Sequence, residues 1–191
     1  MDFEQYKQVI KPRLSQSRYL HSVNVAKEAV KLARRYGEDE KKAETAGILH
    51  DIMKDTPPPE QLQIIESSGI ILTNLERNAP KLWHAVAGMA YLEHVLKITD
   101  SDILNAVRYH TTARAQMTLL EKIIYIADYI SEERDYDGVD LMREYAYTSL
   151  KKAMLYGIQY TIGDLLSRPA PVHPDSFSCY NNLILSKTKE M

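Results

Sequence analysis

Apolar residues recur every three or four positions along almost the whole chain, a spacing that is typical of amphipathic helices. Asp2 is suited to cap a first helix, which Pro12 interrupts. We expect further helices over residues 18–36, 40–53, 60–67, 80–96, 118–130, 139–166 and 175–186, and one that begins after Asp100 or Ser101 and contains His110. The helical pattern is weakest over residues 69–80, which we expect to be mostly loop.

The segment 118–130 is almost wholly apolar, and its β-branched residues would also fit a strand. Its length and the absence of neighbouring strand patterns favour a buried helix. The chain has no repeat, no low-complexity segment and no convincing linker. We therefore predict an all-α fold with a single domain over residues 1–191.

Composition narrows the class of protein. The chain has 191 residues, with 24 Lys and Arg against 26 Asp and Glu, and this net charge of −2 argues against a nucleic-acid binder. No apolar run approaches the roughly 18–20 residues that a membrane helix needs, and the first residues lack the apolar region of a signal peptide. Cys179 is the one cysteine, which rules out a disulfide within the chain and favours a cytoplasmic location.

Six ionisable residues interrupt the apolar faces of the expected helices. Taken singly, each His has an ordinary explanation as a hydrogen-bonded core residue, and Asp128 could be a buried acid paired with Lys or Arg. Together they are better explained by a shared metal centre, because a cation supplies the charge that buried carboxylates lack. The six residues are His21, His50, Asp51, His84, His110 and Asp128.

The neighbours His50 and Asp51 diverge by about 100° on a helix, so both can reach one ion that lies between their directions. Asp51 has two oxygens and can bridge to a second ion. Two metal ions about 3.5–4 Å apart are a common solution for phosphoester cleavage. The residue pattern alone is compatible with a site that holds one metal ion and with a site that holds two.

The ordered set of six resembles the HD-domain superfamily of metal-dependent phosphohydrolases, and the surrounding sequence resembles its bacterial YqeK family. The resemblance covers about residues 17–182 through the stretches RYLHSVNVAKEA, AGILHDIMKD, WHAVAG, VRYHTTARAQMTLLEKIIYIADYI, SEERDYDGVDLMREYA and PVHPDSFSCYNN. It implies an HD-type helical bundle with a metal-binding core over about residues 17–131 and C-terminal helices over about 139–187. Two positions depart from the family pattern: Ala113 stands where we expect Gly, and Tyr180 where we expect Arg.

The resemblance also implies an activity, the symmetrical hydrolysis of diadenosine tetraphosphate to two ADP by a metal-activated hydroxide. It implies that His21, His50, Asp51 and Asp128 hold a first metal, and that His84 and His110 share Asp51 with a second; a single-metal site is the alternative. Iron is the metal expected first, and His and carboxylate ligands also permit manganese, cobalt or zinc. The expected ligands are a dinucleoside polyphosphate or a nucleoside diphosphate.

A polyanionic substrate needs cationic and hydroxyl groups beside the metal. Lys54 lies four positions after His50, on the same face if the helix continues, and is expected to act with Asp51 in catalysis. Arg18 shares the helix face of His21, and Asp55 is expected to orient Lys54 or His50. Arg18, Lys54, Thr111 and Arg134 are the predicted substrate-binding residues, although each could instead be a solvated charge or a cap.

Several alternatives stay open at this point. The same site fits a 5′-nucleotidase, a guanosine-tetraphosphate hydrolase, a cyclic-nucleotide phosphodiesterase or a di-iron oxygenase. A nucleotide-binding module without catalysis and a purely structural helical protein are the non-enzymatic alternatives. A homodimer through residues 139–166 or the C-terminal segment is compatible with the sequence. Tyr109 and Tyr136 are candidates to flank a nucleobase, whereas His173 has no role that the pattern explains.

Overall fold

The computed structural model describes residues 1–186, and this part of the chain is helical and contains no strand. The α-helices are α1 (Phe3–Ile10), α2 (Gln16–Tyr36), α3 (Glu40–Leu49), α4 (Pro58–Ser67), α5 (Asn74–Arg77), α6 (Trp83–His94), α7 (Ser101–Tyr109), α8 (Leu119–Ile130), α9 (Val139–Thr148), α10 (Leu150–Ser167) and α11 (Pro174–Leu185), with a 3₁₀ helix, η1, at Pro80–Leu82. The predicted all-α fold is confirmed. Residue 187, the expected end of the C-terminal helices, lies outside the described residues.

Local signals set most of the helix ends. The side chains of Asp2, Asp100 and Thr118 accept hydrogen bonds from backbone N–H groups in the first turns of α1, α7 and α8. Gly37 ends α2 with φ 78°, a left-handed conformation that Gly adopts without a steric penalty. The apolar segment 118–130 is a buried helix, as its length predicts.

The helix expected over residues 40–53 is shorter than predicted and ends at Leu49. His50 Nδ1 lies 2.8 Å from the carbonyl oxygen of Gly47, the acceptor that a continuing helix would offer to the backbone of Asp51. A turn follows, in which the Lys54 N–H donates to the Asp51 carbonyl oxygen at 2.9 Å. The pair His50–Asp51 therefore lies at a helix end rather than inside a helix.

The prediction of one long helix over residues 139–166 is wrong, because Ser149 separates two helices, α9 and α10. Ser149 adopts an extended backbone with φ −155° and ψ 106°, and its N–H donates to the Tyr145 carbonyl oxygen. Its side chain accepts from the Lys152 N–H at 3.3 Å, so one Ser ends a helix and caps the next. The expected loop 69–80 also contains the short helix α5, which the pair Thr73 and Glu76 caps.

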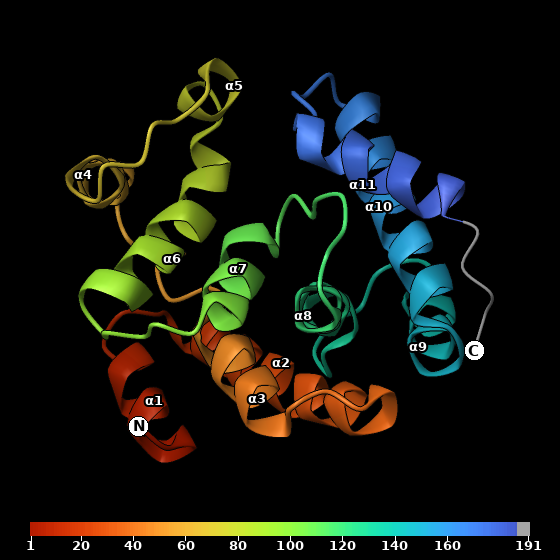
Figure 1. Ribbon diagram of the computed structural model, residues 1–191, viewed down its shortest axis with the longest axis horizontal. Helices are drawn as coiled ribbons and strands as arrows, with labels where there is room; N and C mark the ends of the chain where they lie inside the picture. Colours follow the sequence, from red (N-terminus) through yellow and green to blue (C-terminus); the bar gives the residue numbers. More distant parts are fainter. Residues whose placement is uncertain (187–191) are drawn as a thin grey trace.

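Helix α8 lies at the centre of the molecule (Figure 1). It contacts α2, α3 and α7 on one side and α9 and α10 on the other, so the C-terminal helices complete the same core. Tyr125 of α8 is fully buried in that core. Helices α2 and α3 approach so closely that a Cβ at Gly47 would lie 2.7 Å from the Cα of Ala26.

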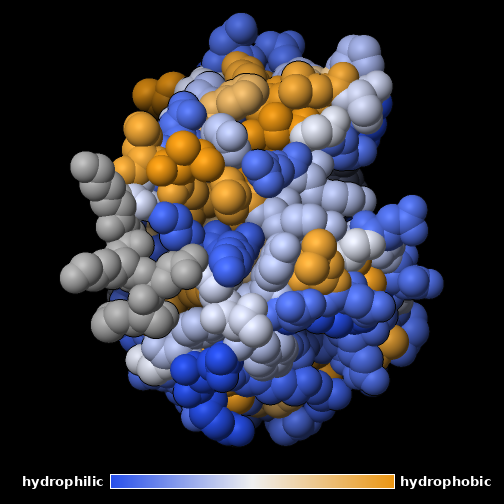
Figure 2. All heavy atoms as spheres, turned by 90° about the vertical axis from the view of Figure 1, so that its right-hand side faces the viewer, coloured by the Kyte–Doolittle hydropathy of each residue, from blue (hydrophilic) through white to orange (hydrophobic). Residues whose placement is uncertain are grey.

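The outer face of α10 and α11 carries a group of exposed apolar side chains, visible as the upper hydrophobic area in Figure 2. Its large members are Leu166, Phe177, Ile184 and Leu185. Apolar groups gathered in this way are more frequent where proteins meet than on the rest of a surface.

Among the described helices, none is long and apolar enough to cross a membrane.

Candidate metal centre

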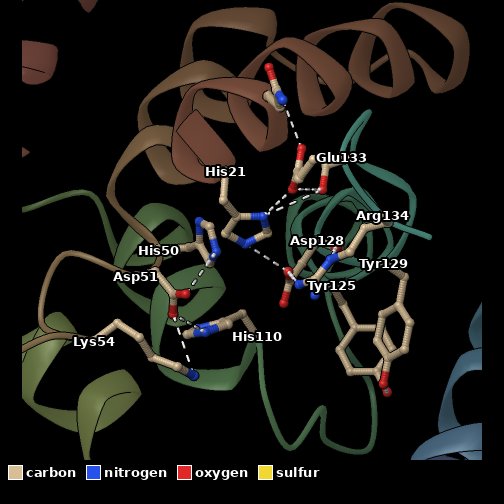
Figure 3. Close-up of polar contacts among 12 residues, drawn as sticks. His21, His50, Asp51, Lys54, His110, Tyr125, Asp128, Tyr129, Glu133 and Arg134 are labelled. Atoms are coloured by element: carbon tan, nitrogen blue, oxygen red, sulfur yellow. Dashed lines mark hydrogen bonds and ion pairs between the residues drawn. The ribbon is translucent and has the colours of Figure 1, made fainter. Parts of the chain in front are cut away.

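The six residues singled out by the sequence converge at the middle of the helical core. Figure 3 shows His21, His50, Asp51, His110 and Asp128 pointing toward one another. His21 comes from the body of α2 and Asp128 from α8, while the other four come from the ends of α3, α6 and α7 or the turns that follow. Their donor atoms form three overlapping groups in which all atoms lie within 4.8 Å of one another: His21, His50 and Asp51; His50, His110 and Asp128; and Asp51, His84 and His110.

Asp51 lies at the centre of this cluster and uses its two oxygens differently. Its Oδ1 atom is 3.3 Å from His84 Nε2 and 3.3 Å from His110 Nε2. Its Oδ2 atom is 3.7 Å from His50 Nε2. One carboxylate therefore faces His50 with one oxygen and the pair of His84 and His110 with the other.

Three of the histidines are oriented by the backbone. Nδ1 of His50, His84 and His110 lies 2.8, 2.9 and 2.7 Å from the carbonyl oxygen three residues earlier in the chain. A carbonyl oxygen only accepts, so each Nδ1 carries the proton, and in the neutral ring Nε2 has a free lone pair. The folded backbone thus fixes the tautomer in which Nε2 can bind a metal.

His21 is oriented by a carboxylate that sequence analysis missed. Its Nδ1 lies 2.5 Å from Oε1 of Glu133, and Glu133 also accepts from Asn24 Nδ2 at 2.7 Å and Ser131 Oγ at 2.6 Å. Burial alone would raise the pKa of Glu133, but these hydrogen bonds outweigh it and lower the pKa to about 2. The ionised carboxylate holds the His21 ring as carboxylates commonly hold metal-binding histidines. The only feature of the sequence that pointed to Glu133 was the presence of an acidic residue shortly after α8.

The cluster has the chemistry of a cation site. Within residues 1–186, His50 Nε2 and Asp51 Oδ1 are buried and have no hydrogen-bond partner, and His21 Nε2 faces Asp128 Oδ1 at 3.0 Å. His84 Nε2 and His110 Nε2 lie only 3.3 Å apart, and two lone pairs that face each other repel unless a cation or proton lies between them. The residues present therefore fit a bound transition metal.

Protonation of His50, His84 and Asp51 agrees with that fit, whereas at His21 the contacts with Asp128 and Glu133 outweigh burial and raise the pKa of the ring. Burial lowers the pKa of His50 to about 4 and that of His84 well below its usual range. Burial would raise the pKa of Asp51, but the neighbouring histidines and Lys54 lower it well below its usual value. Neutral imidazoles and an ionised carboxylate are the forms that bind metals.

All three of the predicted cationic residues reach the cluster. Lys54 Nζ lies 3.0 Å from His84 Nε2 and 3.9 Å from Asp51 Oδ1, although a turn rather than a shared helix face brings it there. Arg18 Nη1 is 3.4 Å from Asp51 Oδ2. Arg134 binds Asp128 through both its carboxylate and its backbone carbonyl.

The remaining predicted residues lie beside the cluster. Thr111 follows His110 but lines a neighbouring cavity. Asp55 does not orient Lys54 or His50; its carboxylate accepts from the backbone N–H of Ser15 at 2.7 Å. A surface hollow of about 540 Å³, with Lys54, Lys81 and His84 in its wall, leads to the cluster from outside.

Comparisons with known proteins agree with this geometry. The HD domain family model matches residues 18–133. A symmetrical bis(5′-nucleosyl)-tetraphosphatase of Bacillus subtilis (strain 168) is 43% identical over 96% of this chain and 98% of its own, and one of Halalkalibacterium halodurans is 38% identical over 94% and 96%. A crystal structure from Clostridium acetobutylicum, described as a predicted HD superfamily hydrolase involved in NAD metabolism, superposes with a TM-score of 0.93 at 37% identity and covers 96% of this chain and 97% of that one. The chain therefore belongs to the HD domain family, and within it to the YqeK branch.

Proposed function

We propose that this protein is an enzyme that hydrolyses diadenosine tetraphosphate symmetrically. Water adds to a phosphorus of the bridge, the central P–O–P linkage breaks, and two ADP leave. The convergence of four histidines and two aspartates, with three Nδ1 atoms held by backbone carbonyls, is the observation that carries the proposal. The relatives from Bacillus subtilis and Halalkalibacterium halodurans are both named symmetrical bis(5′-nucleosyl)-tetraphosphatase, and this shared name supports the choice of substrate.

The proposed cofactor is one or two transition-metal ions, with iron first and manganese, cobalt or zinc as alternatives. His21, His50, Asp51 and Asp128 would hold the first ion, and His84, His110 and Asp51 the second. When bound, such a metal lowers the pKa of water and withdraws charge from phosphate oxygens. The two oxygens of Asp51 face different histidines, which supports a bridging role for this residue.

The chain's cations would stabilise the polyphosphate. Lys54 lies on the accessible side of the cluster, in the wall of the hollow, where its ammonium group can neutralise charge that develops on the departing phosphate. Arg18 and Arg134 lie near Asp51 and Asp128 and can bind neighbouring phosphates. Electrostatic stabilisation by fixed groups is the contribution that we assign to these side chains.

Product analysis tests the proposed reaction. The purified protein, loaded separately with Fe, Mn, Co or Zn, is incubated with diadenosine tetraphosphate, and nucleotides are separated by chromatography. We expect ADP as the sole product with at least one of these metals. Formation of ATP and AMP would overturn the symmetrical reaction. Turnover of a 5′-nucleotide or of guanosine tetraphosphate in place of this substrate would select one of the alternative hydrolases.

Matched variants test the assignment of residues. Asp51→Asn is expected to lose bound metal and turnover together, and Lys54→Ala to lower kcat about 100-fold while metal stays bound. Asp140→Asn is the control, because Asp140 is exposed and pairs with Arg143 on the surface of α9. Full activity of Asp51→Asn would contradict the proposed site.

The proposed association is a homodimer through the exposed apolar residues of α10 and α11, and the proposed compartment is the cytoplasm. Burial of Leu166 and Phe177 by a second copy would remove apolar surface from water. The one thiol, Cys179, is buried and unpaired within the described chain, which suits a reducing compartment. Sedimentation equilibrium of the wild type and of Leu166→Glu tests the dimer, and a monomeric wild type would contradict it.

A further inference from the structure

Glu76 is a buried carboxylate outside the metal cluster, in the short helix α5. It is 4% exposed, and its Oε2 atom accepts from the N–H and the hydroxyl of Thr73, each at 2.9 Å. Its Oε1 atom accepts from Nη2 of Arg108 at 2.5 Å. Burial would raise the pKa of Glu76, but the hydrogen bonds from Thr73 and the contact with Arg108 outweigh it and lower the pKa. The side chain is therefore a buried anion with a specific cationic partner.

The groups that Glu76 binds lie just before two histidines of the cluster. Arg108 precedes His110 by two residues, in the last turn of α7. The backbone carbonyl of Glu76 accepts from Nε1 of Trp83 at 2.7 Å, and Trp83 immediately precedes His84 at the start of α6. One residue is thus bonded both to the end of α7 and to the beginning of α6.

The rings of His84 and His110 follow their backbones, because Nδ1 of each is bonded to a carbonyl oxygen three residues earlier. Their Nε2 atoms lie 3.3 Å apart, and each lies 3.3 Å from Asp51 Oδ1. A metal ion among these three atoms needs its donor atoms at short and fixed distances. A shift of the start of α6 relative to the end of α7 would separate the two rings and weaken this part of the cluster.

Other candidate ligands are oriented by other segments. Glu133, which follows α8, orients His21, and the carbonyl of Gly47 in α3 orients His50. Loss of the contacts that Glu76 makes should therefore affect the two halves of the cluster unequally.

We propose that Glu76 is a positioning residue for a second metal ion. Its carboxylate holds Arg108, and its carbonyl holds Trp83. Together these contacts keep His84 and His110 at the spacing that the ion requires. Glu76 acts through the backbone of α6 and α7 and not as a ligand. This inference rests on the two-ion form of the proposed function.

Metal titration tests the proposal without any nucleotide. The full-length protein is depleted of metal with a chelator and titrated with Mn²⁺, and electron paramagnetic resonance distinguishes a coupled pair of ions from an isolated ion. We expect the wild type to bind a coupled pair. Glu76→Gln keeps the size of the side chain and loses its charge. It should bind the first ion as the wild type does and the second about tenfold more weakly, the lower end of the usual effect of removing a group that orients metal ligands.

A double-mutant cycle tests whether the ion pair is the cause. Glu76→Gln leaves the Arg108 charge without its partner, and Arg108→Met leaves the Glu76 charge without its own; each should weaken the second ion about tenfold. The double variant contains neither charge, so it should lose no more affinity than either single variant. A loss of about 100-fold in the double variant, as for two independent effects, would overturn the proposed pairing.

Glu121→Gln is the matched control. Glu121 is also buried, also caps a helix together with a Thr, and also pairs with an arginine, since its Oε1 atom accepts from Nη2 of Arg114 at 2.6 Å. This pair joins α8 to the loop that precedes it and leaves the contacts of Glu76 intact. Glu121→Gln should lower the melting temperature as Glu76→Gln does and yet retain both ions. An equal loss of the second ion in both variants would show a general effect of destabilisation and would overturn the positioning role.

The two proposals fail in different ways. If the wild type forms ADP from diadenosine tetraphosphate but binds a single Mn²⁺ ion, or if Glu76→Gln binds both ions with unchanged affinity, the positioning role is wrong and the activity stands. If the wild type leaves that substrate intact while Glu76→Gln selectively loses the second ion, the activity is wrong and the positioning role stands.

Discussion

At the residue scale, Ala113 adopts a backbone conformation that L side chains rarely adopt. Its φ is 55°, in the left-handed region, and its side chain is fully buried. This conformation costs a residue with a Cβ roughly 1–2 kcal/mol. The resemblance led us to expect Gly at this position, and the left-handed backbone angle is a physical reason for that expectation.

We predict that Ala113→Gly leaves the free energy of unfolding within about 1 kcal/mol of the wild type. Relief of the left-handed strain offsets the loss of one buried methyl, about 0.8 kcal/mol, and the added flexibility of Gly in the unfolded chain, about 0.5–1 kcal/mol. Ala106→Gly is the control, because Ala106 is equally buried but lies inside α7. It should cost about 2 kcal/mol, from the same methyl and the lower helix propensity of Gly.

Urea denaturation followed by circular dichroism, with the same metal in each sample, measures both variants. Equal destabilisation by Ala113→Gly and Ala106→Gly would show that the left-handed conformation stores no strain.

At the scale of elements, the contact between α2 and α3 sets the position of His50. Gly47 allows the two helices to approach, since a Cβ there would meet the backbone of Ala26 at 2.7 Å. The carbonyl of the same Gly47 accepts from His50 Nδ1. One residue thus determines both the spacing of two helices and the orientation of a candidate metal-binding ring.

We predict that Gly47→Ala lowers the free energy of unfolding by about 1–3 kcal/mol, the usual cost of overpacking, and weakens metal binding. Gly163→Ala is the control, because a Cβ at Gly163 in α10 would have no described atom within 4 Å. It should raise stability by about 1 kcal/mol through helix propensity. Denaturation curves and metal titration measure the two effects, and unchanged metal affinity in Gly47→Ala would contradict the link between helix spacing and His50.

At the scale of the whole molecule, the candidate ligands connect α2, α8 and the ends of α3, α6 and α7. A bound ion would join segments that are more than 100 residues apart in the chain. Because the unfolded chain cannot assemble this site, metal binding adds to the stability of the folded state.

We predict that removal of metal lowers the melting temperature by about 5–10 °C. The reference is protein with free metal at about 100 times its Kd, where binding stabilises the folded state by about 2.7 kcal/mol. In a chain of this length, that free energy corresponds to the stated shift in melting temperature. Scanning calorimetry before and after a chelator measures the shift. The melting temperature of Asp51→Asn should not change when the chelator is added. An equal melting temperature for metal-loaded and chelated wild type would contradict a structural contribution from the site.

The sequence by itself determined the helical class, most helix starts and the six residues that interrupt the apolar pattern. These properties depend on local periodicity and on caps such as Asp100 and Thr118, whose interactions span a few residues. Only the tertiary structure decided that Ser149 breaks a long helix and that Lys54 reaches the site through a turn. It also decided that Glu133, 112 residues after His21, orients that ring, because such a contact arises only when α2 packs against α8.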